Sequence, residues 1–223
     1  MTSGARALLR RGFAAELRRA RGDALPWAFL PLAGLAVASL AVSLVASLPQ
    51  GLRSAPASVV EGFRAELSTS AFSGLLVITS VLVAIGVTLA DRGGVLARDQ
   101  LFCSAGVVFA ARAVSMAFVS ALFGLVSVLL VEATFLVATG AHLLSAETTT
   151  RTIAAFVGAG IWGYLVGVLT RKPILVLFIV PATLMPAMLL AEAAPTIAAA
   201  AMVAWILALG IVAALSVRYR DRL

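Results

Sequence analysis

The dominant feature of this sequence is a series of apolar runs, each about twenty residues long. An α-helix rises about 1.5 Å per residue, so one such run matches the roughly 30 Å hydrocarbon core of a membrane. The composition agrees, because 62% of the 223 residues are hydrophobic and only 12% are charged. Soluble domains carry about twice that charged fraction. The sequence therefore predicts an all-α integral membrane protein.

Turn-forming and charged residues divide the apolar sequence into six predicted membrane-spanning helices. These cover residues 26–48, 71–90, 113–139, 152–169, 173–191 and 196–217. The first run ends at Pro49, Gln50 and Gly51, and the second ends at Asp91, where a charged and glycine-rich segment begins. We expect residues 26–223 to form a single six-helix transmembrane domain.

Residues 1–25 form a basic segment that precedes the first span. Leu9, Phe13 and Leu17 recur at helical spacing. Arg6, Arg10, Arg18 and Arg21 fall mostly on other faces of the helix. This pattern predicts an amphipathic helix lying on the cytoplasmic membrane surface, with its arginines near anionic lipid headgroups. A solvated basic tail that only fixes the topology is the alternative.

The basic residues predict an orientation in the membrane. If the N-terminus is cytoplasmic, all but three of the 17 lysines and arginines fall on the cytoplasmic side, the exceptions being Arg53, Arg64 and Arg151. Cytoplasmic loops of membrane proteins carry such an excess. Six spans then place both termini in the cytoplasm. We attribute the net charge of +7 to this orientation and not to nucleic-acid binding.

The sequence offers no set of catalytic residues. It contains one histidine and one cysteine, which excludes an intramolecular disulfide and a cysteine-based metal site. A P-loop needs Ser or Thr directly after its lysine, but the sole lysine, Lys172, is followed by Pro173. We therefore expect no enzyme activity, no bound cofactor or metal, and no ATPase site in this chain.

Small residues in the fourth predicted span are interpreted as helix-packing positions. Gly158, Gly160 and Gly163 match a dinucleotide-binding pattern, but no strand precedes them and no acidic residue follows at the required distance. A stripe of small residues repeats every four positions in the same helix: Ala155, Ala159, Gly163 and Gly167. Such stripes favour close contact between membrane helices.

Three residues inside the apolar runs are candidates for the cargo pathway or for gating. Glu132 is the one carboxylate well inside a run, and an ionisable group in a membrane suggests a function. Glu132 lies near the outer end of its span. The alternative to a functional role is therefore that its carboxylate reaches toward the outer membrane–water interface. Pro181 and Pro186 predict bends in the fifth span, which serve either gating or static packing.

The segment between the second and third spans carries a family resemblance. It reads Asp91-Arg92-Gly93-Gly94-Val95-Leu96-Ala97-Arg98-Asp99-Gln100-Leu101, and later Ala110-Ala111-Arg112-Ala113. An acidic residue, a glycine and basic segment, an apolar piece and a basic residue thus follow in order. This arrangement resembles the permease subunits of ABC-2 type transporters, which are bacterial exporters. Asp91 stands where that family usually has Glu, Val95 where Thr is common, and Ser104-Ala105 where a proline often lies.

The resemblance implies a membrane permease subunit of an ATP-driven exporter in the bacterial cytoplasmic (inner) membrane. Such a subunit works with a separate cytosolic ABC ATPase, which binds the ATP, and with a second permease copy in a homodimer or heterodimer. The cargo would be small and hydrophobic or amphipathic, such as a drug, a peptide or a lipid. The alternatives are a membrane scaffold or assembly protein without transport and an ion-driven secondary carrier.

The resemblance also implies a cytoplasmic coupling helix between the second and third spans. We expect this helix to contact the ATPase subunit through Arg92, Arg98, Asp99, Leu101 and Phe102. Ordinary membrane-surface charges are the alternative interpretation of these residues. The mixed sequence 95–112 predicts a short helix lying across the membrane surface.

Overall fold

The structure is a computed structural model that describes residues 57–94, 104–139, 142–193 and 195–220, with single positions between 34 and 46. Five helices make up these ranges: α3 (Ala57–Arg92), α5 (Ala105–Thr139), α6 (Ala146–Thr170), α7 (Pro173–Ala193) and α8 (Pro195–Arg220). No strand occurs among the described residues. The predicted all-α class is therefore confirmed for this part of the chain.

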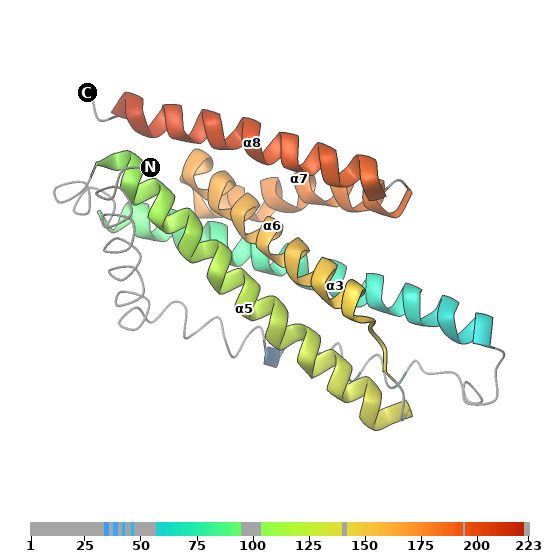
Figure 1. Ribbon diagram of the computed structural model, residues 1–223. Coiled ribbons are helices and arrows are strands. Elements are labelled where there is room, and N and C mark those ends of the chain that lie inside the picture. The colour runs from blue at the N-terminus through green and yellow to red at the C-terminus, as the bar shows by residue number, and fades with distance from the viewer. Residues whose placement is uncertain are drawn as a thin grey trace, which may run out of the picture.

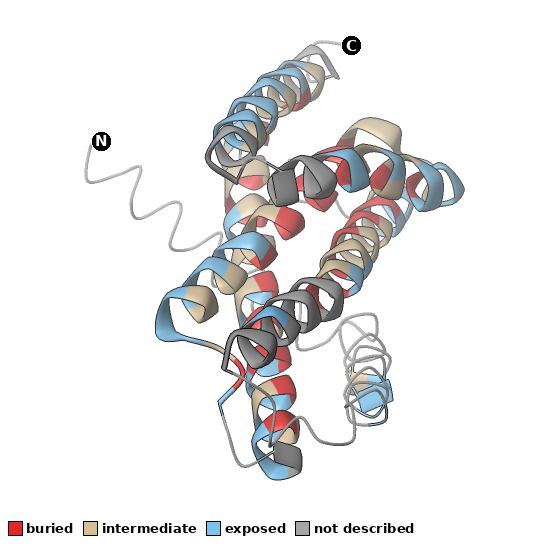
Figure 2. Cartoon of the chain, turned by 90° about the vertical axis from the view of Figure 1, so that its right-hand side faces the viewer, coloured by how far each residue is buried: buried red, intermediate tan, exposed pale blue. Residues whose placement is uncertain are grey.

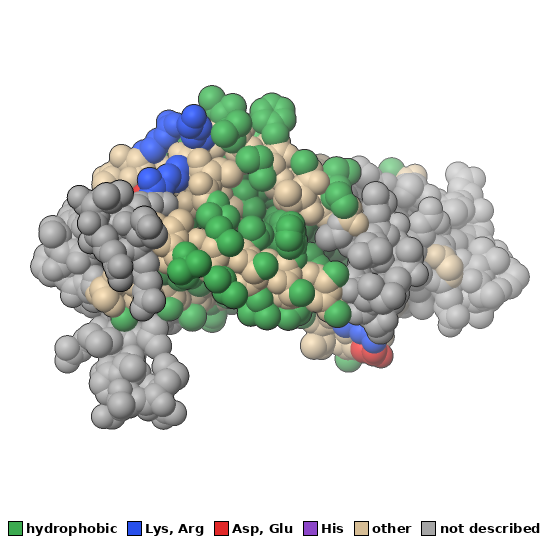
Figure 3. Space-filling view, turned by 90° about the horizontal axis from the view of Figure 1, so that it is seen from above, with side chains coloured by type: hydrophobic (Ala, Val, Ile, Leu, Met, Phe, Trp, Pro, Cys, Tyr) green, Lys and Arg blue, Asp and Glu red, His purple; other side chains and the backbone are tan. Residues whose placement is uncertain are grey.

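Three of the described helices contain stretches long and apolar enough to cross a membrane. These stretches are Phe72–Arg92 in α3, Ala105–Val137 in α5 and Ala146–Thr170 in α6. Shorter apolar stretches lie in α7 and α8. Large apolar side chains such as Phe118 and Phe178 are exposed on the outside of the bundle, and Figure 3 shows apolar side chains gathered over one face. Such a surface suits lipid better than water, which indicates a membrane-embedded protein.

One predicted span start is wrong. The apolar stretch of α5 begins at Ala105 instead of residue 113, whereas the predicted second span, 71–90, agrees with the apolar stretch Phe72–Arg92, although α3 itself begins earlier, at Ala57. Hydropathy detects the membrane-embedded part of a helix, but a helix continues into polar sequence until a residue breaks it. The predicted surface helix over 95–112 is therefore also wrong from Ala105 onward. The predicted segments 1–25 and 26–48 lie outside the described residues, apart from the single positions.

Consecutive helices of the bundle run in alternating directions, as Figure 1 shows. α6 packs against each of the other four helices, with α3 and α5 making the most extensive contacts. α7 and α8 form a hairpin in which α7 packs on α3 and α6, and α8 packs on α6 and α5. Figure 2 shows buried residues on the sides of the helices that face one another. One end of the bundle collects the C-terminal ends of α3, α6 and α8 together with the N-terminal ends of α5 and α7.

Small residues on α6 allow it to approach α3 closely. A Cβ added at Gly167 would lie 2.8 Å from the carbonyl oxygen of Ala84, and one added at Gly163 would overlap the backbone of Ser80. Ser80 Oγ donates a hydrogen bond to the carbonyl oxygen of Ala159 at 2.7 Å. Van der Waals packing at close approach and interhelical hydrogen bonds hold membrane helices together. Both are present here, so this contact holds α6 on α3.

Candidate functional site at the basic end of the bundle

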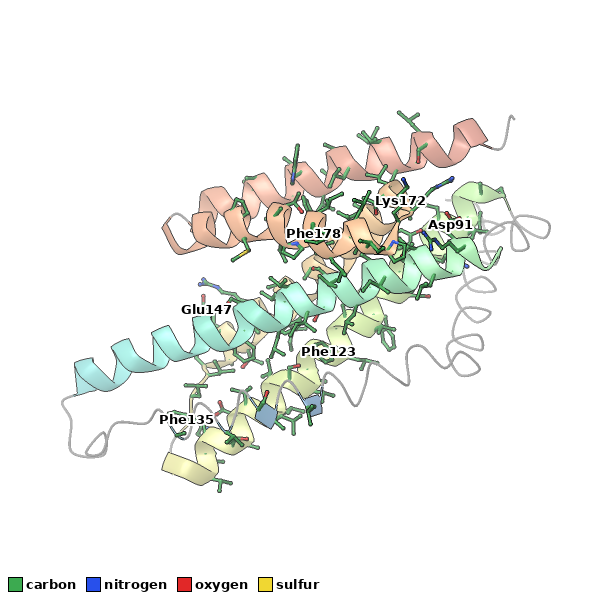
Figure 4. The ribbon with its side chains drawn as sticks, turned by 180° about the vertical axis from the view of Figure 1, so that it is seen from behind. Asp91, Phe123, Phe135, Glu147, Lys172 and Phe178 are labelled. Carbon is green, nitrogen blue, oxygen red and sulfur yellow. The ribbon has the colours of Figure 1, made fainter. Side chains whose placement is uncertain are left out.

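The charged side chains of the described residues separate toward the two ends of the bundle. Arg92 ends α3, and Arg171 and Lys172 form the turn between α6 and α7. We call this the basic end. Figure 4 places Asp91 and Lys172 at this end and Glu147 at the other, where Glu147 pairs with Arg151 one turn along α6. Such an asymmetry is typical of the two surfaces of a membrane protein.

An ion pair at the basic end joins segments that are far apart in the sequence. Arg171 Nε lies 3.4 Å from Asp91 Oδ2, and the two side chains are 41% and 24% exposed, respectively. Arg171 Nε is shielded from solvent and makes no hydrogen bond to the described residues. The Asp91 carboxylate therefore compensates the charge of a cation that water reaches only in part.

The backbone fixes both partners of this pair. Arg171 adopts the left-handed conformation, with φ 53°, and its N–H donates to the carbonyl oxygen of Gly167 at 3.1 Å. After Asp91, the N–H of Gly94 donates to the carbonyl oxygen of Asp91 at 3.2 Å, and Gly94 takes a positive φ of 68°, so α3 ends here. Arg171 thus caps α6 while its side chain reaches toward the end of α3.

The predicted partner-contact residues are only partly described. Arg92 is exposed at the end of α3, one position beyond Asp91. The other four, Arg98, Asp99, Leu101 and Phe102, lie outside the described residues. Their contact role stays a prediction. Asp91 and Arg171 were not among the predicted contact residues, since no pattern along the sequence indicates a pair between two distant turns.

Arg112 lies in an unexpected environment. The sequence predicts it as a cytoplasmic charge at the start of the third span, but it is only 4% exposed on α5. Since α5 begins at Ala105, Arg112 lies about 10 Å along the helix, inside the bundle. A buried arginine at this depth is rare unless its charge is compensated within the protein. Hydropathy alone gives no sign of this burial.

Glu132 lies at the end opposite to the basic end and holds the connection between α5 and α6. Its Oε1 pairs with Nδ1 of His142 at 2.9 Å, and its carboxylate accepts the N–H groups of Leu143 and Leu144 at 3.1 to 3.2 Å. The Glu132 side chain is only 20% exposed. Ser145 then caps α6 through its side chain. Glu132 therefore satisfies backbone donors that would otherwise be unpaired near the bundle end.

Pro181 and Pro186 both lie inside α7, which remains a continuous helix. Each proline lacks the N–H that would bond to the carbonyl four residues earlier. Thr183, between them, donates its hydroxyl to Ile179 O at 2.7 Å and accepts the Trp162 indole N–H at 3.1 Å. Trp162 is buried. The segment between the two prolines is thereby held on α6.

The predicted stripe of small residues is only partly buried. Ala159, Gly163 and Gly167 are buried where α6 meets α3. Ala155 is exposed and takes no part in this contact, so its predicted packing role stays a prediction. The physical reason is the helical repeat, because a four-residue step advances about 40° around the helix and the stripe slowly leaves the contact.

These features define the described part of the chain as an all-α, membrane-embedded helical bundle. Comparison with protein-family models, with curated proteins and with solved structures found no match. Within the described ranges, no group of three or more His, Cys, Asp or Glu side chains is placed to hold a metal ion. Further interpretation therefore depends on the geometry of the bundle and its two ends.

Proposed function

We propose that this chain is the membrane permease subunit of an ATP-driven ABC exporter. In this proposal it spans the bacterial cytoplasmic membrane six times with both termini in the cytoplasm. It pairs with a second permease copy and with a cytosolic ATPase subunit that binds ATP. The cargo is a small hydrophobic or amphipathic molecule.

The observation that carries this proposal is the position of Asp91. Asp91 is the acidic residue with which the resemblance to ABC-2 permeases begins, and it lies at the basic end, paired with Arg171. The predicted ATPase-contact segment follows it directly in sequence. A partner that binds this segment would therefore act on the end of α3 and, through the ion pair, on the turn between α6 and α7.

The packing of α6 on α3 supports such a transmission. Gly163 and Gly167 bring the two helices into backbone contact, which leaves no room for independent sliding at those positions. Rigid helices of this kind move as bodies when force is applied to one end. In the proposed cycle, ATP-driven closure of two ATPase subunits changes the side from which a cavity between two permease copies is open.

The environment of Glu132 disfavours the ion-driven carrier. Secondary carriers use ionisable groups within the membrane for ion binding. Glu132 is the single candidate from the sequence, and its carboxylate already accepts two backbone N–H groups and pairs with His142. A carboxylate committed to a connecting loop is poorly placed for repeated ion exchange.

Co-purification tests the proposal. The tagged chain is extracted in detergent together with its native membranes and cytosol, and ATP hydrolysis by the purified sample is measured. We expect an ATP-hydrolysing partner that Arg98→Glu releases. Arg151→Glu, a charge reversal at the opposite end of the bundle, is the matched control and should leave the partner bound. Recovery of the chain without any ATPase would contradict the proposal and favour the scaffold.

A further inference from the structure

We infer that the Asp91–Arg171 pair is a positioning link that makes the end of α3 and the turn between α6 and α7 respond together to the partner. This inference rests on the proposed function, because it assigns a regulatory role to the site where the ATPase would bind. Neither residue is proposed to contact ATP or cargo. They act through the segments that they connect.

Both residues occupy positions where the local backbone disfavours their residue type. Asp91 lies in the last turn of α3, where the helix dipole is negative and a carboxylate is unfavourable. Arg171, with φ 53°, occupies a left-handed capping position that usually takes glycine. Local conflicts of this kind mark positions selected for something other than local stability. The ion pair between the two residues explains both conflicts at once.

The link is rigidly supported on the α6 side. The N–H of Arg171 bonds to the carbonyl oxygen of Gly167, and Gly167 itself packs on Ala84 and Val87 of α3. Arg171 is therefore positioned by the same close contact that joins the two helices. A displacement of Asp91 is transmitted to α6 by the ion pair and also by this packing, which lies about one to two turns before Asp91 in α3.

A distance measurement tests the link in the full chain without the ATPase. Nitroxide labels are attached to Leu89→Cys and Leu175→Cys, two exposed positions at the basic end, in a Cys103→Ser background. We expect a narrow distance distribution in the otherwise native chain and a broader one in Asp91→Asn. The exchanged pair, Asp91→Arg with Arg171→Asp, should restore the narrow distribution, because each residue type then occupies a backbone position that tolerates it. An unchanged distribution in Asp91→Asn overturns the inference.

A second measurement separates linkage from folding. Arg171→Gly removes the ion pair but also relieves the left-handed strain, so its thermal unfolding temperature in detergent should not fall. We expect Arg171→Gly to broaden the label distribution. We also expect the co-purified partner to hydrolyse ATP at least about fivefold more slowly with Arg171→Gly than with the native chain. If the partner binds and its activity is unchanged in Arg171→Gly, the link is overturned while the exporter proposal stands. If no ATPase co-purifies with the native chain, the exporter proposal fails and with it the regulatory role of the link.

Discussion

Gly163 and Gly158 belong to the same glycine-rich sequence but lie in different environments. A Cβ at Gly163 would overlap the Ser80 backbone, whereas one at Gly158 would meet nothing within 4 Å. We predict that Gly163→Ala destabilises the bundle by about 1–3 kcal/mol, the usual cost of overpacking. Thermal unfolding in detergent, followed by circular dichroism, measures this change.

Gly158→Ala is the matched control for that substitution. Alanine is the better helix former, so this variant should be neutral or more stable by roughly 0.5–1 kcal/mol. Equal unfolding temperatures for the two variants would show that α6 and α3 are not in backbone contact in solution.

Glu132 leads to a second prediction for a single residue. Glu132→Ala leaves the N–H groups of Leu143 and Leu144 without their acceptor, which should cost about 1–3 kcal/mol. Hydrogen exchange at these two amides should accelerate. Glu147→Ala, which removes an exposed partner of Arg151, is the control and should cost only about 0.3–0.5 kcal/mol. Unchanged exchange at both amides in Glu132→Ala would contradict the assigned role.

A hydrogen bond from Trp162 of α6 to Thr183, which lies between the two prolines of α7, adds to the apolar packing between these helices. Thr183→Val keeps the shape of the side chain but removes the acceptor for the Trp162 indole N–H. We expect a loss of about 0.6 kcal/mol, the average for interhelical hydrogen bonds in membranes. In a Trp162→Phe background the same change should cost less, since the bond is already absent. Equal costs in both backgrounds would show that the two side chains are not coupled.

The sequence predicts which segments form helices better than it predicts their starts and contacts. Predicted spans two to six each fall within one of α3, α5, α6, α7 and α8, because runs of apolar residues depend only on local composition. The start of the third span is wrong, and the part of α3 before residue 71 was not predicted, because hydropathy reports membrane depth and not how far a helix continues.

The candidate site was less predictable for a different reason. The ion pair between Asp91 and Arg171 depends on how α3 and α6 pack, which neither segment encodes alone. The burial of Arg112 likewise follows from its neighbours in space. The sequence gives only a partial sign of the role of Arg171. This residue follows Thr170, the last residue of α6, and so occupies a capping position where glycine is common.

The orientation of the whole bundle can be measured by labelling single cysteines. In a Cys103→Ser background, Lys172→Cys reports on the basic end and Glu147→Cys on the opposite end. Because cytoplasmic surfaces carry the excess of lysine and arginine, we expect a membrane-impermeant maleimide to label Glu147→Cys in intact cells. It should label Lys172→Cys only in inside-out vesicles. Denatured samples control for the presence of each thiol.

This orientation is also a requirement of the proposed function. A cytosolic ATPase can reach Arg92 and the segment that follows it only if the basic end faces the cytoplasm. The reversed labelling pattern would place the Asp91–Arg171 pair outside the cell and exclude the exporter proposal without disturbing the fold. About 35 Å of α6 separates Glu147 from the turn that contains Lys172, so the two positions should lie on opposite sides of the membrane. Labelling of both positions from one side would therefore contradict the proposal that α6 spans the membrane.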